Sequence, residues 1–364
     1  MSDDALEKLR SKIDLIDSNL LELFNQRAQC AMDVAEVKRK EQGSSIETVD
    51  FFRPDREASV IQRFKDNNPG PLSDAEAGRL IREVMSACLA LEQPLKIGYL
   101  GPEGTFTQTA ALKHFGHSVS TVPMGSIPDV FNAVESHIVD FGLVPVENST
   151  EGVISHTLDM FIKSGLKVCG EVEIRIHHLL VSQDSDISKI ERIYSHQQSL
   201  AQCRRFLDQN FPGIPKIPVS SNAEAARMAS NEANAAAICG AAAAEIYDLK
   251  TCYENIEDLS DNTTRFVIIG HQKIGRSGQD KTSLLVSTHN TPGALLLLLK
   301  PFADNGISMN KIESRPAPAG KWEYVFFIDI DGHETDEPVH NALKSLKENA
   351  ALCKILGSYP KAVL

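Results

Sequence analysis

Positively charged side chains interrupt an otherwise apolar helical pattern at the start of the chain. Apolar residues recur three and four apart along the first forty residues, and Arg27 stands where this rhythm requires another apolar side chain. A guanidinium keeps its charge and is almost never buried without an anionic partner, so the pattern predicts a buried anion beside Arg27. A polar residue that fixes the register of a coiled coil would explain Arg27 equally well. The apolar positions are Leu6, Leu9, Ile13, Ile16, Leu20, Leu23, Cys30, Val34 and Val37.

A second cation, Lys38, lies on the same face of this helix as Arg27. Residues 11 positions apart return to within about 20° of each other and lie ~16 Å apart along a helix axis. Two long cationic side chains at this spacing can hold opposite ends of one small dianion. Arg10 precedes Arg27 by 17 positions and points about 100° away from it, so a site that Arg10 serves would belong to another copy of the helix.

The spacing of apolar residues predicts an all-helical unit over residues 1–93. After the long first helix, a short helix is expected from 54 to about 66, and the sequence Pro-Gly-Pro at 69–71 ends it. Ser73 with Glu76 forms a capping box that opens a third helix. The other two helices are too short to cover the first, so we expect a homodimer or a higher homo-oligomer.

From Lys96 onward, short apolar strands alternate with helices, which is typical of an α/β fold. From Thr282 the order strand, helix, strand, strand, helix, strand is that of a ferredoxin-like βαββαβ unit, which belongs to the α+β class. The expected α/β strands are 97–100, 141–146, 167–172, 179–181, 190–194 and 236–239. In the last unit, helices are expected at 293–305 and 338–349, and strands from 282 and at 307–314, 324–330 and 354–359.

Composition restricts the possible functions. A chain of 364 residues with 42% hydrophobic content can form two or three domains, and its net charge of -12 argues against a nucleic-acid partner. No apolar stretch approaches the length of a membrane span, and the acidic N-terminus does not resemble a signal peptide, so we expect a cytoplasmic protein. Seven cysteines without a Cys-x-x-Cys pair indicate reduced thiols and no structural metal.

The first 93 residues resemble the all-helical chorismate mutase domain. That resemblance implies a pericyclic rearrangement of chorismate to prephenate, which needs no cofactor, metal or nucleophile. The enzyme has to hold a flexible dicarboxylate folded and stabilise the charge that develops on the breaking ether oxygen. By the same resemblance, arginines bind the carboxylates, Lys38 faces the ether oxygen, Glu57 accepts from the ring hydroxyl, and Arg10 reaches the partner's site. The positions that match the family's substrate-binding residues are Arg10, Arg27, Lys38, Arg56 and Glu57.

Two positions depart from the serine and glutamine that the bacterial family places on the third helix. They are Cys88 and Glu92 here, and both are expected to contact substrate. A carboxylate would repel a developing oxyanion, so Glu92 can donate a hydrogen bond only when protonated. We therefore expect mutase activity to decline as pH rises.

Polar turns that follow strands and open helices recur through the α/β region. They are found at 98–106, 146–152 and 194–199, and free amides at helix N-termini bind carboxylates. With the segment 261–266, these turns resemble the motifs of prephenate dehydratase over residues 96–272. The resemblance implies a periplasmic-binding-protein-like fold of two α/β lobes with the substrate between them. One lobe would contain 96 to about 173 plus about 250 to 272.

The dehydratase resemblance also implies site residues. Thr264 would assist departure of the ring hydroxyl, and Arg265 would bind a carboxylate, although an ordinary turn hydroxyl also explains Thr264. The other positions expected to contact prephenate are Thr105, Asn148, Ser149, Ser195, His196 and Phe266.

Residues 281–364 resemble a regulatory ACT domain. Its two motifs imply a phenylalanine pocket between protomers, whereas a packing module that only dimerises explains the same segment. The motif residues are Gly293, Ala294, Leu295, Glu313, Ser314 and Arg315. Together the resemblances imply an enzyme that converts chorismate to prephenate and then to phenylpyruvate, under phenylalanine feedback. The alternatives are a mutase fused to an NAD-dependent dehydrogenase, which the missing nucleotide fingerprint disfavours, and a non-catalytic amino-acid sensor.

Overall fold

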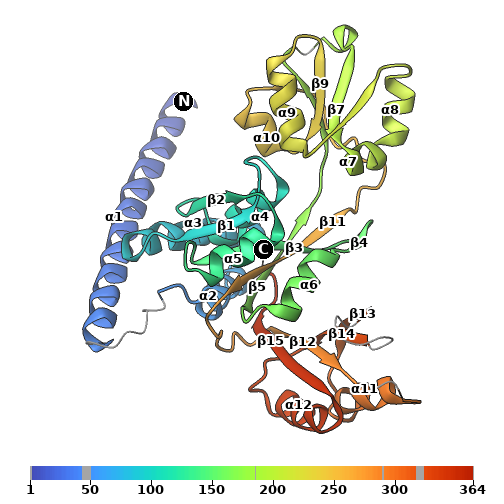
Figure 1. The fold of residues 1–364 in the computed structure, drawn as a ribbon. Helices are drawn as coiled ribbons and strands as arrows, with labels where there is room; N and C mark the ends of the chain where they lie inside the picture. The colour runs from blue at the N-terminus through green and yellow to red at the C-terminus, as the bar shows by residue number, and fades with distance from the viewer. Residues whose placement is uncertain (1, 43–50, 185, 289–290, 317–323, 364) are drawn as a thin grey trace.

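The computed structural model describes residues 2–42, 51–184, 186–288, 291–316 and 324–363, and Figure 1 shows their arrangement. The first region contains the three predicted helices: α1 (Ser2–Gln42), α2 (Pro54–Asp66) and α3 (Asp74–Glu92). Pro54 opens α2, where its missing N–H costs nothing, and the Ser73 side chain accepts from the Glu76 backbone N–H at the start of α3. None of the described helices combines the length and apolarity that a bilayer crossing needs.

The first α/β lobe is a six-stranded sheet in the order β2-β1-β3-β11-β5, with β4 paired to β3. The strands β1, β2 and β3 are parallel, and β11 runs antiparallel between β3 and β5. The strands are β1 (Lys96–Leu100), β2 (Ser120–Met124), β3 (Phe141–Asn148), β4 (Gly152–Val153), β5 (Lys167–Arg175) and β11 (Thr263–Gly270). The helices are α4 (Phe106–Phe115), α5 (Ile127–Glu135) and α6 (Ser155–Lys163).

The second lobe is a five-stranded sheet in the order β10-β6-β9-β7-β8, and it lies at the top of Figure 1. The chain crosses between the lobes after β5 and returns before β11, which confirms the predicted two-lobed fold. The predicted return at about residue 250 is wrong, because β10 at 250–253 pairs with β6 in the second lobe. Its strands are β6 (Leu179–Ser182), β7 (Arg192–His196), β8 (Lys216–Val219), β9 (Ala235–Cys239) and β10 (Lys250–Tyr253). Its helices are the 3₁₀ turn η1 (Ile187–Lys189), α7 (Gln197–Gln202), α8 (Arg204–Asn210), α9 (Asn222–Asn231) and α10 (Ala241–Ile246).

The C-terminal region forms the predicted βαββαβ unit, with strand order β13-β14-β12-β15. Buried apolar side chains of its two helices pack on one face of this sheet. Its elements are β12 (Asp280–Ser287), α11 (Ala294–Asp304), β13 (Met309–Pro316), β14 (Tyr324–Asp331), α12 (Glu337–Asn349) and β15 (Leu352–Pro360).

The three regions share cores and do not pack as separate globules. Phe52 and Leu89 of the helical region lie in one apolar cluster with Phe115 and Phe141 of the first lobe. At the other junction, β15 approaches β5 so closely that a Cβ on Gly357 would lie 2.1 Å from the Val168 carbonyl oxygen. Only glycine fits there, and this close backbone contact packs β15 directly against β5 of the first lobe. The predicted boundaries 1–93, 96–272 and 281–364 stay predictions, because the packing crosses them.

Candidate active sites

Charged side chains from all three N-terminal helices gather along the C-terminal half of α1. Arg27 and Lys38 are half-buried on α1, Glu57 comes from α2 and Glu92 from α3. Burial raises the pKa of Glu57, against the opposing charges of Arg82 and Arg27. Burial likewise raises the pKa of Glu92, against the opposing charges of Lys38, Arg27 and Arg39. The structure therefore brings together four of the residues that the helical spacing and the mutase resemblance single out.

The Arg27 guanidinium has no hydrogen bond and no ion pair within 4 Å among the described residues. The two carboxylates that lie near enough to be influenced by it are those of Glu57 and Glu92. The neighbouring α1 side chain of Arg39 instead donates to the Glu92 carbonyl oxygen at 2.7 Å and fastens α1 to α3. The ammonium of Lys38 lies 5.4 Å from the centre of the Phe51 ring. The Arg27 guanidinium is therefore available to an external anion.

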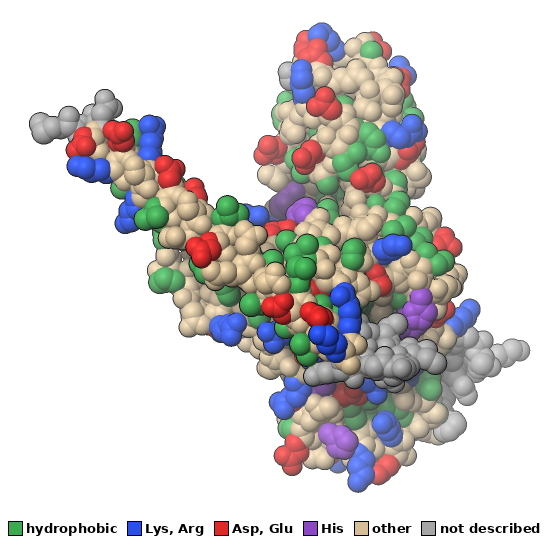
Figure 2. Space-filling view, turned by 90° about the vertical axis from the view of Figure 1, so that its left-hand side faces the viewer, with side chains coloured by type: hydrophobic (Ala, Val, Ile, Leu, Met, Phe, Trp, Pro, Cys, Tyr) green, Lys and Arg blue, Asp and Glu red, His purple; other side chains and the backbone are tan. Residues whose placement is uncertain are grey.

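The outer wall of this cluster is incomplete in a single chain. Arg10 is exposed on the part of α1 that projects from the body, and Arg56 is exposed on α2. Cys88 is buried on α3 beneath the cluster. Figure 2 shows apolar side chains spread along the projecting helix, among them Leu9 with 61% of its surface exposed. The seam predicted to be covered is thus open in one protomer.

A second candidate site is the cleft between the two α/β lobes, with a volume of about 860 Å³. Both lobes and both crossing segments contribute to its wall. Of the residues expected from sequence, those that line it are Thr105, Asn148, His196, Thr264 and Phe266. Ser199 and Asn222, at the N-terminal ends of α7 and α9, also line it. The lining residues include no lysine or arginine, so backbone amides at helix starts are the main groups available to an anionic ligand.

A hydrogen-bond network fixes the orientation of Thr264. The Asn148 side-chain amide donates to Thr264 Oγ1 at 2.8 Å and to Asn262 Oδ1 at 2.8 Å. The Asn148 Oδ1 accepts from the backbone N–H of Thr150 and of Glu151, so the amide cannot be reversed without losing those bonds. Because the Thr264 oxygen accepts from Asn148, its own proton can be donated into the cleft.

Several residues that line the cleft were not predicted from the sequence. Gln202 Oε1 accepts from Asn262 Nδ2 at 3.2 Å and bonds to His178 Nε2 at 2.9 Å, which links the two lobes across the crossing segments. Burial lowers the pKa of His178, so its ring is neutral. Phe106 packs edge-on against this ring. Asn262 lay inside a recognised motif, but His178 and Gln202 carried no spacing signal that could have found them.

Two serines expected to contact substrate, exposed Ser149 and buried Ser195, are not among the residues that line the cleft. Ser149 Oγ accepts from the Thr263 backbone N–H at 2.9 Å. Ser195 is fully buried and donates to Asn222 Oδ1 at 3.0 Å. Neither serine lines the cleft, so the predicted contacts are corrected to supporting positions that hold Thr263 and Asn222 in place.

The expected carboxylate contact of Arg265 is contradicted by its orientation. Neighbouring residues of a strand point to opposite faces, so Arg265 leaves the sheet on the side away from Thr264. Its guanidinium pairs with Glu171 at 2.8 Å and with Asp329 of β14 at 2.6 Å, and it donates to the Tyr359 hydroxyl at 3.0 Å. Strand β11 was not predicted from the sequence. The alternation of side chains between the two faces of a strand could therefore not be used to place Arg265.

The residues of the two C-terminal motifs lie at the start of α11 and on the edge strand β13. Gly293 precedes α11 with φ of +80°, which glycine adopts without strain, and it is followed by buried Ala294 and exposed Leu295. Glu313 and Ser314 lie on β13. Arg315 is already engaged, because it bonds to Ser155 and pairs with Asp159 of α6 at 2.7 Å. Its expected contact with an effector is therefore corrected to a link with the first lobe.

Comparison with known proteins covers the whole chain. Three family models match successive segments: chorismate mutase type II over residues 9–93, prephenate dehydratase over 97–274 and ACT domain over 282–348. The bifunctional chorismate mutase/prephenate dehydratase of Pseudomonas aeruginosa is 54% identical over 99% of this chain and 99% of its own length. The protein of the same name from Neisseria gonorrhoeae is 49% identical over 100% of this chain and 99% of its own. The structure of prephenate dehydratase from Arthrobacter aurescens in complex with L-Phe is 34% identical, with a TM-score of 0.68 over 74% of this chain and 90% of that one.

Proposed function

The chain belongs to the family of bifunctional chorismate mutase/prephenate dehydratases, and from this premise we propose how its two reactions are distributed over the fold. It is an enzyme that rearranges chorismate to prephenate and converts prephenate to phenylpyruvate. The observation that carries the proposal is the presence of two separate sites of opposite character. One is a cluster of cations and carboxylates among three helices, and the other is a largely apolar cleft without lysine or arginine among its lining residues.

The helical cluster suits the mutase reaction. Arg27 binds a carboxylate of chorismate, the Lys38 ammonium stabilises negative charge on the breaking ether oxygen, and Glu57 accepts from the ring hydroxyl. Because these groups come from α1 and α2, which pack on α3, they are in place before substrate arrives. The remaining donor is Glu92, whose burial favours the protonated form that can donate a hydrogen bond.

The role of Glu92 predicts an alkaline loss of mutase activity. The protonated carboxyl is the active form, and its pKa is raised above the ordinary 4.5, so activity is full below the raised pKa and falls as pH rises through it. We expect Glu92→Gln to remove this loss of mutase activity at high pH, because an amide donates a hydrogen bond at every pH. The measurement is mutase kcat/KM from pH 4.5 to 9, with Glu36→Gln on the exposed side of α1 as the control. A Glu92→Gln profile identical to that of the unmodified enzyme would exclude the assignment.

The cleft suits the dehydratase reaction. The bond from the ring to its carboxylate breaks, and that carboxylate leaves as carbon dioxide. The electron pair of the bond enters the ring, and the carbon–oxygen bond opposite breaks as the hydroxyl leaves. The leaving hydroxyl takes a proton and departs as water, and the ring becomes aromatic. Thr264 points its proton into the cleft, and the Asn148 amide stabilises charge on the Thr264 oxygen as that proton is given. Helix N-terminal amides receive the carboxylates of prephenate.

The C-terminal domain contacts the strand that carries Thr264, which gives phenylalanine a physical route to the cleft. Arg265, the next residue along β11, pairs with Asp329 of β14. An effector that shifts β14 therefore acts on the backbone beside the catalytic hydroxyl. Between 1 and 3 kcal/mol of coupling, about 5- to 150-fold in affinity, is typical of such regulation.

We further propose that a second copy of the chain covers the exposed seam of α1. Apolar side chains along most of α1 are open to solvent in one protomer, and a large contiguous patch of this kind marks an association surface. Arg10 lies beyond the reach of its own cluster, about 25 Å from Arg27 along the helix axis, and would complete the site of the partner.

A coupled assay tests the whole assignment. With chorismate as the added substrate and no cofactor, we expect prephenate to form first and phenylpyruvate to follow, and we expect added phenylalanine to slow phenylpyruvate formation. Product that forms only after NAD is supplied would indicate the dehydrogenase alternative. Phenylalanine binding without turnover of chorismate or prephenate would indicate the amino-acid sensor.

A further inference from the structure

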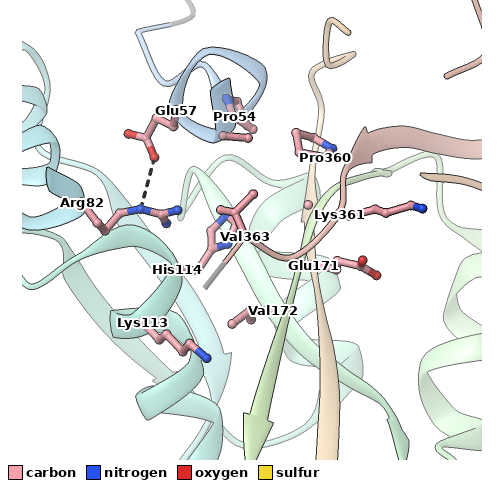
Figure 3. Close-up of a pocket in the computed structure, with 12 residues that line it drawn as sticks. Pro54, Glu57, Arg82, Lys113, His114, Glu171, Val172, Pro360, Lys361 and Val363 are labelled. Carbon is pink, nitrogen blue, oxygen red and sulfur yellow. Dashed lines mark ion pairs between the residues drawn. The ribbon is translucent and has the colours of Figure 1, made fainter. Parts of the chain in front are cut away.

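A small cavity lies where the helical region, the first lobe and the C-terminal tail meet. Its volume is about 30 Å³, which is room for a water molecule, and Figure 3 shows the side chains around it. The buried guanidinium of Arg82, on α3, extends between Glu57 and the ring of His114. The residues that line the cavity are Pro54, Glu57, Ala58, Arg82, Lys113, His114, Gly170, Glu171, Val172, Pro360, Lys361 and Val363.

Arg82 is an unusual residue to find at this depth. Only 4% of its surface is exposed, and its Nε and Nη1 atoms have no hydrogen-bond partner among the described residues. Burying a charged guanidinium costs free energy of folding unless an anion lies close to it. The anion within 4 Å of it is Glu57, with 3.9 Å between Arg82 Nε and Glu57 Oε2. Glu171 lines the same cavity but points away from Arg82, toward Arg265 and Lys281.

The separation of 3.9 Å has a consequence for Glu57. It is too long for a hydrogen bond, so Arg82 acts on Glu57 through charge and does not occupy its oxygen lone pairs. The side chain of Glu57 keeps 15% of its surface exposed, so the carboxylate is still accessible. The Glu57 carboxylate can therefore accept a hydrogen bond from a ligand while the nearby positive charge of Arg82 stabilises its negative charge.

We propose that Arg82 is a positioning residue for the mutase reaction, which holds the Glu57 carboxylate charged and in place from within the junction cavity. This inference rests on the proposed role of Glu57 in that reaction. Because the cavity walls include α4, β5 and the tail after β15, the support for Glu57 comes from all three regions of the chain. The mutase site thus depends on residues far outside the helical region.

The charged groups around Glu57 determine the pH dependence. The charged groups that act on Glu57 are Arg82 from α3 and Arg27 from α1. The other titratable residues of the cavity wall are Lys113 and His114 from α4, Glu171 from β5 and Lys361 from the tail. Of these, Lys113 donates to the Glu173 carbonyl oxygen, Glu171 pairs with Lys281, and Lys361 pairs with Asp331. Burial raises the pKa of Glu57, and Arg82 and Arg27 oppose that rise. Burial lowers the pKa of His114 well below its usual value, so that ring stays neutral and does not replace the charge of Arg82.

The test is the pH profile of mutase kcat/KM in Arg82→Gln. Glu57 is active when ionised, so mutase activity is lost as pH falls through its pKa. Without Arg82 that pKa rises further, and we expect the acid limb to move up by about one pH unit, which is a fall of about tenfold in kcat/KM at pH values below the limb. Arg82→Lys, which keeps the charge, should restore most of both. The matched control is Arg79→Gln on the exposed face of the same helix, where Arg79 pairs only with Glu76 among the described residues.

Two further measurements separate positioning from a merely structural role. Dehydratase turnover in the same chains reports whether the junction still folds, and we expect it to stay within twofold. In a Glu57→Gln background, where residue 57 no longer titrates, the acid limb should be absent, and adding Arg82→Gln should not change the acid side of the profile. An unmoved acid limb in Arg82→Gln, or equal losses in both activities that Arg82→Lys does not restore, would overturn the proposal. An unmodified enzyme without mutase activity would instead refute the proposed function itself.

Discussion

We expect replacement of Thr264 with alanine to abolish dehydratase turnover and to leave mutase turnover within twofold. The substitution removes the hydroxyl whose proton is directed into the cleft, and general acid catalysis of this kind contributes roughly 10²- to 10⁴-fold in rate. The mutase cluster contains no residue of the cleft, so its reaction is unaffected. The measurement is phenylpyruvate formation from prephenate, alongside prephenate formation from chorismate in the same preparation.

Thr264→Ser and Thr263→Ala are the matched variants for this result. Serine keeps a hydroxyl at the same position, so we expect it to retain much of the activity. The side chain of Thr263 bonds to the Asp261 carbonyl oxygen and not to the Asn148 amide, so its removal should have little effect. If Thr264→Ala kept more than a tenth of the dehydratase rate, the hydroxyl would not be the proton donor.

We expect replacement of Lys38 with methionine to remove most of the mutase activity. Methionine has a similar length and lacks the charge, so the variant tests the ammonium and not the packing. By comparison with the removal of other preorganised donors, the transition state should lose roughly 3 to 4 kcal/mol, which is about 150- to 900-fold in rate. Because the ammonium acts on charge that develops during the reaction, the loss should appear in kcat.

Lys40 offers a control for Lys38 on the same helix. It is exposed and pairs with Glu36 one turn earlier, so Lys40→Met should change neither activity measurably. Dehydratase turnover in the Lys38→Met chain should equal that of the unmodified enzyme. A mutase loss smaller than tenfold would show that the cation facing the ether oxygen is another residue.

The two active sites lie in regions that are physically continuous. Phe52 and Leu89 of the mutase helices are part of the apolar core of the first lobe, and Gly357 of the last strand contacts the backbone of β5. A shift of the side chains at one of these junctions therefore alters the packing of the neighbouring region, because close-packed interiors are not freely deformable. This continuity explains why Arg265 and Arg315, expected at ligand sites, instead form ion pairs between the lobe and the C-terminal domain.

The sequence determined the features that depend on local spacing. The period of apolar residues identified the three helices and the βαββαβ unit, and helical arithmetic placed Arg27 and Lys38 on one face. One arginine in an apolar seam predicted a buried anion beside Arg27, and the family resemblance identified that anion as the mutase substrate. These conclusions need only geometry within one element or the order of elements along the chain.

Tertiary structure decided the contacts between elements. Local spacing along the sequence does not show which neighbour a given face of a strand or helix will meet. Strand β11 places Thr264 toward the cleft and Arg265 toward the C-terminal domain, although the two residues are adjacent. His178 and Gln202 meet Asn262 only after the chain has crossed between the lobes. Arg82 reads as an ordinary helix residue in sequence, and only the packing of three regions around it buries its charge beside Glu57.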